Sequence, residues 1–129
     1  GSILNVASSA GLFPAGPYMA TYYATKSYVT SLTRAVALEL KEKKSNVYVG
    51  ALCPGPVDTE FNKVANVEFA IPSITPTYCA AYAIRKMEKR KIVIVPKNKM
   101  KVLAFISRVL PQSLVIRMTA RQQKKKRSW

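Results

Sequence analysis

Three short apolar runs mark the strands that the hydrophobic pattern predicts. Residues 2–8 form a near-continuous apolar run, which is typical of a parallel strand buried on both faces. Residues 46–52 alternate and then become apolar, and residues 92–95 read Ile-Val-Ile-Val. Each run ends close to a glycine or proline, so we expect short strands separated by longer connections.

Amphipathic stretches lie between and after these runs. Residues 18–43 predict a long helix, because apolar side chains recur at helical spacing at Val29, Leu32, Val36 and Leu40. Thr75 and Pro76 are a typical helix start, with a capping hydroxyl before a proline, and this helix is expected to reach about residue 90. Strands that alternate with helices predict an α/β fold with a parallel sheet.

A tyrosine and a lysine near the start of the long predicted helix are the first chemically informative feature. Tyr22 and Lys26 are four residues apart, so a helix places them on one face. An ammonium group beside a phenol favours the phenolate, and we therefore expect the pKa of Tyr22 to fall from about 10 toward neutrality. Such a phenol can donate or accept a proton near pH 7. Tyr23 has only Ser27 four positions on, so the pairing favours Tyr22.

A serine lies thirteen residues before Tyr22, at the end of the first apolar run. At the carboxyl end of a parallel strand, Ser9 is expected to point into the crevice where open α/β sheets bind ligands, and to hydrogen-bond a substrate carbonyl there. The alternation of a strand sends Ser8 and Ser9 to opposite faces, so only one of them faces the crevice. The spacing to Tyr22 favours Ser9.

Three segments together resemble the short-chain dehydrogenase/reductase family. They are Asn5-Val6-Ala7-Ser8-Ser9-Ala10-Gly11, Tyr22-Tyr23-Ala24-Thr25-Lys26 and Cys53-Pro54-Gly55-Pro56-Val57-Asp58-Thr59, in that order and spacing. A Tyr-x-x-x-Lys pair alone is common by chance, whereas the three segments together are specific. The resemblance covers nearly all of the chain and implies the C-terminal half of a Rossmann-like, doubly wound parallel sheet with extra C-terminal helices.

The resemblance implies hydride transfer between NAD or NADP and a carbonyl or alcohol. Tyr22 would donate the proton to the carbonyl oxygen, Lys26 would hold the nicotinamide ribose, and Ser9 would polarise and orient the carbonyl.

The third segment is implied to bind the cofactor as well, through Pro54, Gly55, the backbone at Val57, and Thr59. Val57 and Thr59 would meet the nicotinamide carboxamide. Thr59 is equally typical of a cap for a short helix that begins near Glu60, and both interpretations stay open.

The chain also departs from that family. A typical member begins with a strand and a glycine-rich turn that receives the cofactor pyrophosphate, and no stretch of these 129 residues reads Gly-x-x-x-Gly-x-Gly. We therefore expect a C-terminal half of a larger protein, in which residues 1–96 form the catalytic half-domain and residues 97–129 form basic amphipathic helices. Alone, the chain is expected neither to bind cofactor tightly nor to turn over, and its half sheet should expose an apolar edge strand.

Two further segments leave alternatives open. Residues 60–75 have no clear period, and they fit a lid over the substrate or an ordinary connection equally well. A helix from about residue 98 is expected to be apolar at Val102, Leu103, Ile106, Val109 and Leu110.

After Pro111, a second helix to about residue 126 sets apolar residues against Arg117, Arg121 and Lys124; its apolar residues are Leu114, Val115, Ile116 and Met118. This pattern is typical of a helix in a membrane interface, although helices that cover the substrate pocket look the same.

Composition adds a strong positive charge. The net charge is +15, from 21 Lys and Arg against 6 Asp and Glu, and such an excess attracts phosphate-bearing surfaces. Histidine is absent, and Cys53 and Cys79 are too far apart for a zinc site, so we expect no metal, two small buried thiols and a cytoplasmic protein. No run approaches the roughly 20 apolar residues of a membrane-spanning helix.

Two functions are consistent with these features. The first is an NAD(P)-dependent oxidoreductase in lipid metabolism that acts on an apolar small molecule, such as a 3-oxoacyl chain or a steroid. For this function the resemblance also implies a homo-oligomer through the helix Tyr18–Lys43. The alternative is an inactive fragment or interaction module that binds anionic membrane surfaces peripherally through its basic C-terminal helix. Aromatic residues are not interleaved with the basic ones, so no specific nucleic-acid partner is expected.

Overall fold

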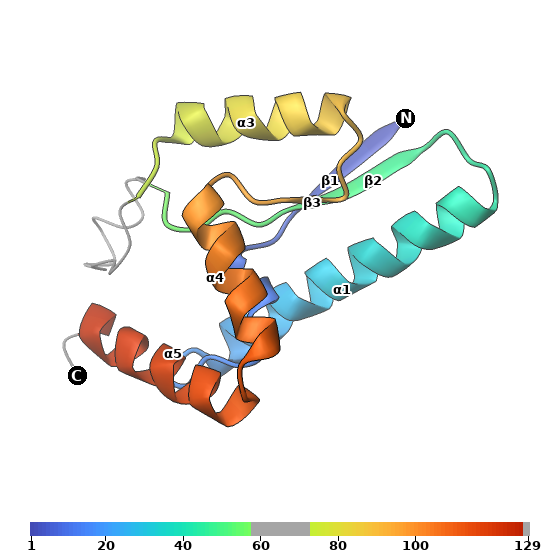
Figure 1. The fold of residues 1–129 in the computed structure, drawn as a ribbon. Coiled ribbons are helices and arrows are strands. Elements are labelled where there is room, and N and C mark those ends of the chain that lie inside the picture. Colours follow the sequence, from blue (N-terminus) through green and yellow to red (C-terminus); the bar gives the residue numbers. More distant parts are fainter. Residues whose placement is uncertain (58–72, 128–129) are drawn as a thin grey trace.

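The structure, a computed structural model, describes residues 1–57 and 73–127 of the chain. Its sheet contains three parallel strands, β1 (Ser2–Val6), β2 (Tyr48–Leu52) and β3 (Val93–Ile94), in the order β1-β2-β3 (Figure 1). β1 pairs with β2 along its whole length, from Ser2 opposite Tyr48 to Val6 opposite Leu52. The predicted parallel α/β sheet is thus confirmed.

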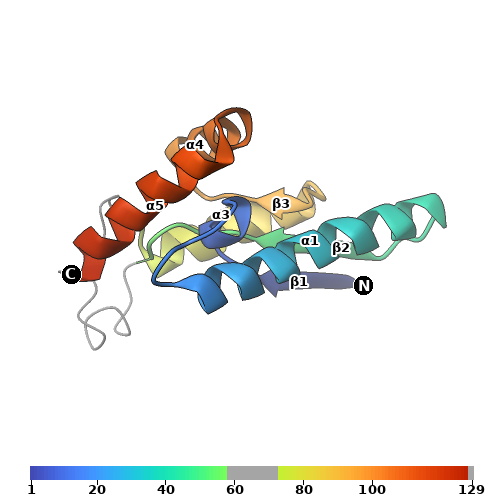
Figure 2. The same cartoon turned by 90° about the horizontal axis from the view of Figure 1, so that it is seen from below.

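The helices are α1 (Ala20–Glu42), α3 (Pro76–Glu88), α4 (Asn98–Val109) and α5 (Gln112–Arg127), with a short 3-10 helix η1 (Ser9–Leu12) after β1. α1 and α3 lie on opposite faces of the sheet, as expected for a doubly wound sheet (Figures 1 and 2). α4 and α5 lie toward the carboxyl ends of the strands (Figure 1). The predicted start of α3 is confirmed, because the Thr75 hydroxyl accepts a hydrogen bond from the Tyr78 amide and Pro76 occupies the first turn.

The central strand β2 divides the core in two, because successive side chains of a strand point to opposite faces. The cluster on the α1 side contains Ala7, Ala51, Cys53, Val95 and Met100. The cluster on the α3 side contains Leu52, Cys79, Tyr82, Ala83 and Ile94. Both cysteines are buried and unpaired, which confirms the prediction for the thiols.

The exposure of β1 differs from the prediction. It was expected to be buried on both faces, yet Ile3 is 53% and Val6 62% exposed. The reason is that β1 lies at the edge of the sheet and pairs only with β2 within the described ranges. The expectation of an exposed apolar edge strand is met, and the strand ends at Val6, two residues earlier than its pattern suggests.

The buried face of α1 also differs from its predicted apolar stripe. Leu32 is exposed, and the helix instead buries Thr30 and Thr33 together with Ala37. Small side chains let the helix approach the sheet closely, and the two threonine hydroxyls donate to backbone carbonyls of the preceding turn, at 2.9 and 2.7 Å. Thr33 also accepts a 2.9 Å hydrogen bond from the Asn5 amide, so Asn5 has a structural partner.

Within the part of the chain that the structure describes, none of the helices has the length and apolar character needed to cross a membrane.

Candidate active site

Tyr22 and Lys26 lie in the first two turns of α1, which begins at Ala20. The Lys26 ammonium nitrogen is 5.7 Å from the centroid of the Tyr22 ring, so the two side chains share one face of the helix. Lys26 also donates a hydrogen bond to the carbonyl of Val6 at 3.4 Å, which holds its ammonium group at the end of β1. Tyr22 is 42% exposed.

Ser9 lies just beyond β1, as the first residue of η1. Its backbone amide donates a 2.8 Å hydrogen bond to the Pro54 carbonyl, which joins the first predicted segment to the third. Ser8 is buried, and its hydroxyl accepts a hydrogen bond from the Ala10 amide at 3.2 Å. Strand alternation was expected to send the two serines to opposite faces, but the strand ends before them, at Val6. The two differ instead because Ser8 caps η1.

Gly11 allows η1 to pack directly against α1. A Cβ atom at this position would lie 2.6 Å from the carbonyl oxygen of Lys26, closer than any side chain tolerates. Only glycine permits this approach. The turn that begins at Ser9 is therefore held against the helical turn that carries Lys26.

The segment after β2 forms the other side of this region. A Cβ atom at Gly55 would lie 3.0 Å from the methyl carbon of Met100, so α4 packs against the turn. Val57 forms an isolated parallel bridge with Ile74, whose amide donates to the Pro56 carbonyl at 3.0 Å. Thr59 and most of the segment 60–75 lie outside the described residues.

Two residues that the sequence did not single out support the start of α1. Tyr23 is buried, and its hydroxyl accepts a 2.8 Å hydrogen bond from the side-chain amide of Gln123 in α5. Burial raises the pKa of Tyr23, and Tyr22 raises it further, while the bond from Gln123 acts in the opposite direction. Nothing in the sequence pointed to Gln123, which lies 100 residues away in a polar, basic stretch.

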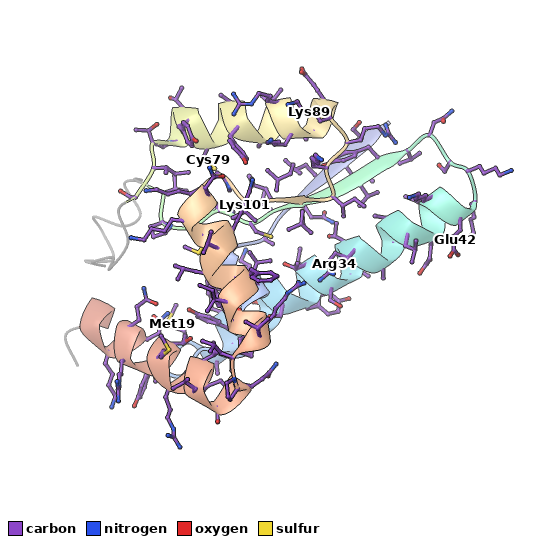
Figure 3. The ribbon with its side chains drawn as sticks, in the orientation of Figure 1. Met19, Arg34, Glu42, Cys79, Lys89 and Lys101 are labelled. Atoms are coloured by element: carbon purple, nitrogen blue, oxygen red, sulfur yellow. The ribbon has the colours of Figure 1, made fainter. Side chains whose placement is uncertain are left out.

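A basic cluster surrounds Tyr82 on the other face of the sheet. The side chains of Arg85, Lys86 and Lys101 lie 5.2, 5.3 and 5.6 Å from the centre of its ring. Lys101 extends from α4 toward α3 and donates a 2.8 Å hydrogen bond to the Tyr82 hydroxyl (Figure 3). These contacts join α3 to α4 and give that side of the molecule a positive charge.

The region at the ends of β1 and β2 therefore combines a phenol, an ammonium group and a serine hydroxyl. A phenol can supply a proton to an oxygen atom, an ammonium group next to it favours the charge left behind, and a hydroxyl can orient a carbonyl. The structure brings Tyr22 and Lys26 together and packs the turn of Ser9 against the turn of Lys26.

Known proteins similar in sequence to this chain are dehydrogenases and reductases. The sequence model of the short chain dehydrogenase family matches residues 1–68. A very-long-chain 3-oxoacyl-CoA reductase of Anas platyrhynchos is 27% identical over 128 residues, which are 99% of this chain and 39% of that protein. A D-beta-hydroxybutyrate dehydrogenase of Rhizobium meliloti (strain 1021) is 46% identical over 59 residues, which are 46% of this chain and 22% of that protein.

A solved structure shows the same fold. The crystal structure of a short chain dehydrogenase from Burkholderia cenocepacia J2315 in complex with NADP matches with a TM-score of 0.73 and 26% identity, over 91% of this chain and 48% of that one. The matched part of the chain thus spans less than half the length of each of these proteins.

Proposed function

This chain belongs to the short-chain dehydrogenase family, and on that premise we propose that the protein containing it interconverts a carbonyl and an alcohol, with NAD or NADP as cofactor. The observation that carries the proposal is the position of Lys26. Its ammonium group lies beside the Tyr22 ring and is bonded to the end of β1, next to the turn that Ser9 begins.

The proposed roles follow from these contacts. The Tyr22 hydroxyl gives its proton to the carbonyl oxygen of the substrate during reduction and takes it back during oxidation. Lys26 stabilises the phenolate by its positive charge. Ser9, held by its backbone bond to Pro54, orients the carbonyl through its hydroxyl.

The residues present fit one end of the cofactor. Lys26 offers an ammonium group whose one described hydrogen-bond partner is a backbone carbonyl, so it can also donate to the hydroxyl groups of a ribose. Pro54, Gly55 and Val57 form an adjoining turn, and Thr59 follows it; we propose that they meet the carboxamide. When bound, the nicotinamide supplies or accepts the hydride. We expect residues 1–129 alone to bind NADPH weakly, because they include no glycine-rich phosphate turn.

The proposed substrate is apolar, such as a 3-oxoacyl chain or a steroid. Its support is the likeness over 99% of the chain to a protein named very-long-chain 3-oxoacyl-CoA reductase. We also propose a homo-oligomer through α1, which leaves Tyr28 and Leu32 exposed.

Oxidation of NADPH or NADH by the full-length protein with long-chain 3-oxoacyl and steroid ketones tests the proposal. Tyr22→Phe removes the proton donor and keeps the ring, so turnover should fall about 100- to 10,000-fold. Tyr23→Phe controls for effects on the start of α1, because it removes the buried hydroxyl that Gln123 binds but keeps the Tyr22 hydroxyl and Lys26.

Two outcomes would contradict the proposal. One is a Tyr22→Phe protein that turns over at the parent rate. The other is a loss of activity equal in both variants, since that would indicate a general effect on the start of α1. Circular dichroism of each variant separates loss of chemistry from loss of fold.

A second candidate function is binding to an anionic membrane surface. The observation that favours it is the distribution of charge, because residues 89–129 contain 13 Lys and Arg and no Asp or Glu. Such a segment attracts anionic headgroups without any requirement for a cofactor, so the two functions can be tested separately.

A further inference from the structure

α4 has apolar side chains on two opposite faces. One face packs into the molecule through Met100 and Ser107, which are buried. The opposite face carries a stripe at helical spacing whose members are all exposed: Val102, Phe105, Ile106 and Val109. Phe105 and Val109 are the most exposed of these, at 68% and 67%. A water-facing helix surface normally carries polar residues, so this stripe needs an explanation.

α5 does not present the apolar face that its sequence suggests for a membrane. Val115 is buried, and it shares the inward side of α5 with Thr119 and Gln123. Of the apolar residues expected to meet the membrane, only Leu114 and Met118 are exposed. Leu114 and Met118 are therefore the residues of that predicted face that α5 leaves open, while the buried Val115 holds α5 to the fold.

Positive charge accompanies this apolar surface. Lys99 and Arg108 on α4 and Arg117 and Arg121 on α5 are all exposed. The last acidic residue of the chain is Glu88, so no carboxylate from α4 or α5 can neutralise them. An apolar stripe with cations beside it complements a bilayer whose surface carries anionic headgroups.

We propose that the outward face of α4, together with Leu114 and Met118, inserts into the surface layer of an anionic phospholipid membrane, with the neighbouring Lys and Arg on the headgroups. This inference deepens the second candidate function and does not depend on the reductase activity. A lipid surface fits better than a nucleic acid, because the stripe is aliphatic apart from Phe105 and offers no row of rings for base stacking.

The first test measures binding of the complete protein to phosphatidylcholine vesicles with and without phosphatidylserine. We expect binding that depends on phosphatidylserine. The double variant Phe105→Ser with Val109→Ser should weaken it by about tenfold or more, because the inserted apolar area is lost. The control is Tyr78→Ser with Ile84→Ser on α3, which changes two exposed residues outside α1 and α4, and it should bind like the parent.

The second test locates the contact. Trp129 is the single tryptophan of residues 1–129, so Phe105→Trp in a Trp129→Phe background places one tryptophan of these residues on the stripe, and the Trp129→Phe protein gives the background emission. The emission that Phe105→Trp adds should shift to the blue on addition of phosphatidylserine vesicles, whereas the emission that Tyr78→Trp adds in the same background should not shift. A Tyr22→Phe protein should bind vesicles like the parent.

Several results would overturn the proposal. They are unchanged vesicle binding by the α4 double variant, equal binding to neutral vesicles, no blue shift at position 105, or displacement from vesicles by RNA at matched phosphate concentration. If the parent protein reduces ketones but does not bind phosphatidylserine vesicles, the membrane proposal is rejected and the reductase proposal is not. Normal vesicle binding without any ketone reduction would reject the reductase alone.

Discussion

The side-chain amide of Gln123 donates a 2.8 Å hydrogen bond to the hydroxyl of Tyr23, and both side chains are buried. This bond ties the end of α5 to the first turn of α1. It is reinforced by Lys124, whose ammonium nitrogen lies 5.4 Å from the centroid of the Tyr18 ring. The C-terminal helix therefore supports the residue that directly follows Tyr22 in the candidate active site.

Gln123→Leu should destabilise the protein by about 1–3 kcal/mol, because it leaves the buried Tyr23 hydroxyl without its donor. Urea unfolding measures the loss. Gln112→Leu, an exposed position in the same helix, is the control and should change little. If Gln123→Leu with Tyr23→Phe is less stable than Gln123→Leu alone, the unpaired hydroxyl is not the cause of the loss.

The raised pKa of Tyr23 predicts a specific loss of stability at alkaline pH. Burial raises this pKa above the value of about 10 expected in the unfolded chain. As the pH rises, Tyr23 therefore loses its proton first in the unfolded state. The stability that neutral Tyr23 contributes is complete below about pH 10, and it declines as the pH rises through the pKa of Tyr23 in the folded protein.

Urea unfolding of the parent and of Tyr23→Phe from about pH 8 to pH 11 measures this effect. The stability advantage of the parent should be constant at first and then shrink above about pH 10. Tyr48 also has a pKa raised by burial, but it is common to both proteins and cancels in the comparison. If the stability advantage of the parent grew with pH instead, folding would lower the pKa of Tyr23 and not raise it.

Gly16→Ala should be destabilising. A Cβ atom at Gly16 would overlap the ring of Tyr23, which Gln123 and burial hold in place. We expect a loss of about 1–3 kcal/mol, as is usual for overpacking in a core. Gly55→Ala is a milder comparison, because its new methyl group meets only the flexible end of Met100. A lower melting temperature for Gly55→Ala than for Gly16→Ala would contradict this explanation.

The two thiols should react slowly in the folded protein. Burial raises the pKa of both Cys53 and Cys79, and for Cys53 the hydrogen bonds from Thr30 and the Ser8 backbone only partly offset it. Because the thiolate is the reactive form, alkylation by iodoacetamide should be at least about 100-fold slower than in the unfolded chain. Mass spectrometry follows each site, and fast labelling of either cysteine without urea would show that its burial is not maintained.

Local features were readable from the sequence wherever the physical cause is local. A helix spacing of four residues places Tyr22 and Lys26 on one face whatever surrounds them, and a threonine before a proline caps α3 through atoms of the same turn. The order of strands and helices followed in the same way from hydrophobic period. Those properties depend on neighbours within a few residues along the chain.

The sequence by itself thus determined the elements, their order and the pairing of Tyr22 with Lys26. Tertiary structure decided which faces became buried: Thr30 and Thr33 in place of Leu32 on α1, an exposed stripe on α4, an edge position for β1, and the bond between Gln123 and Tyr23. The physical reason is that burial depends on which partner lies opposite a side chain. An amphipathic period shows that a helix has an apolar side, but it cannot show whether protein, lipid or water lies against it.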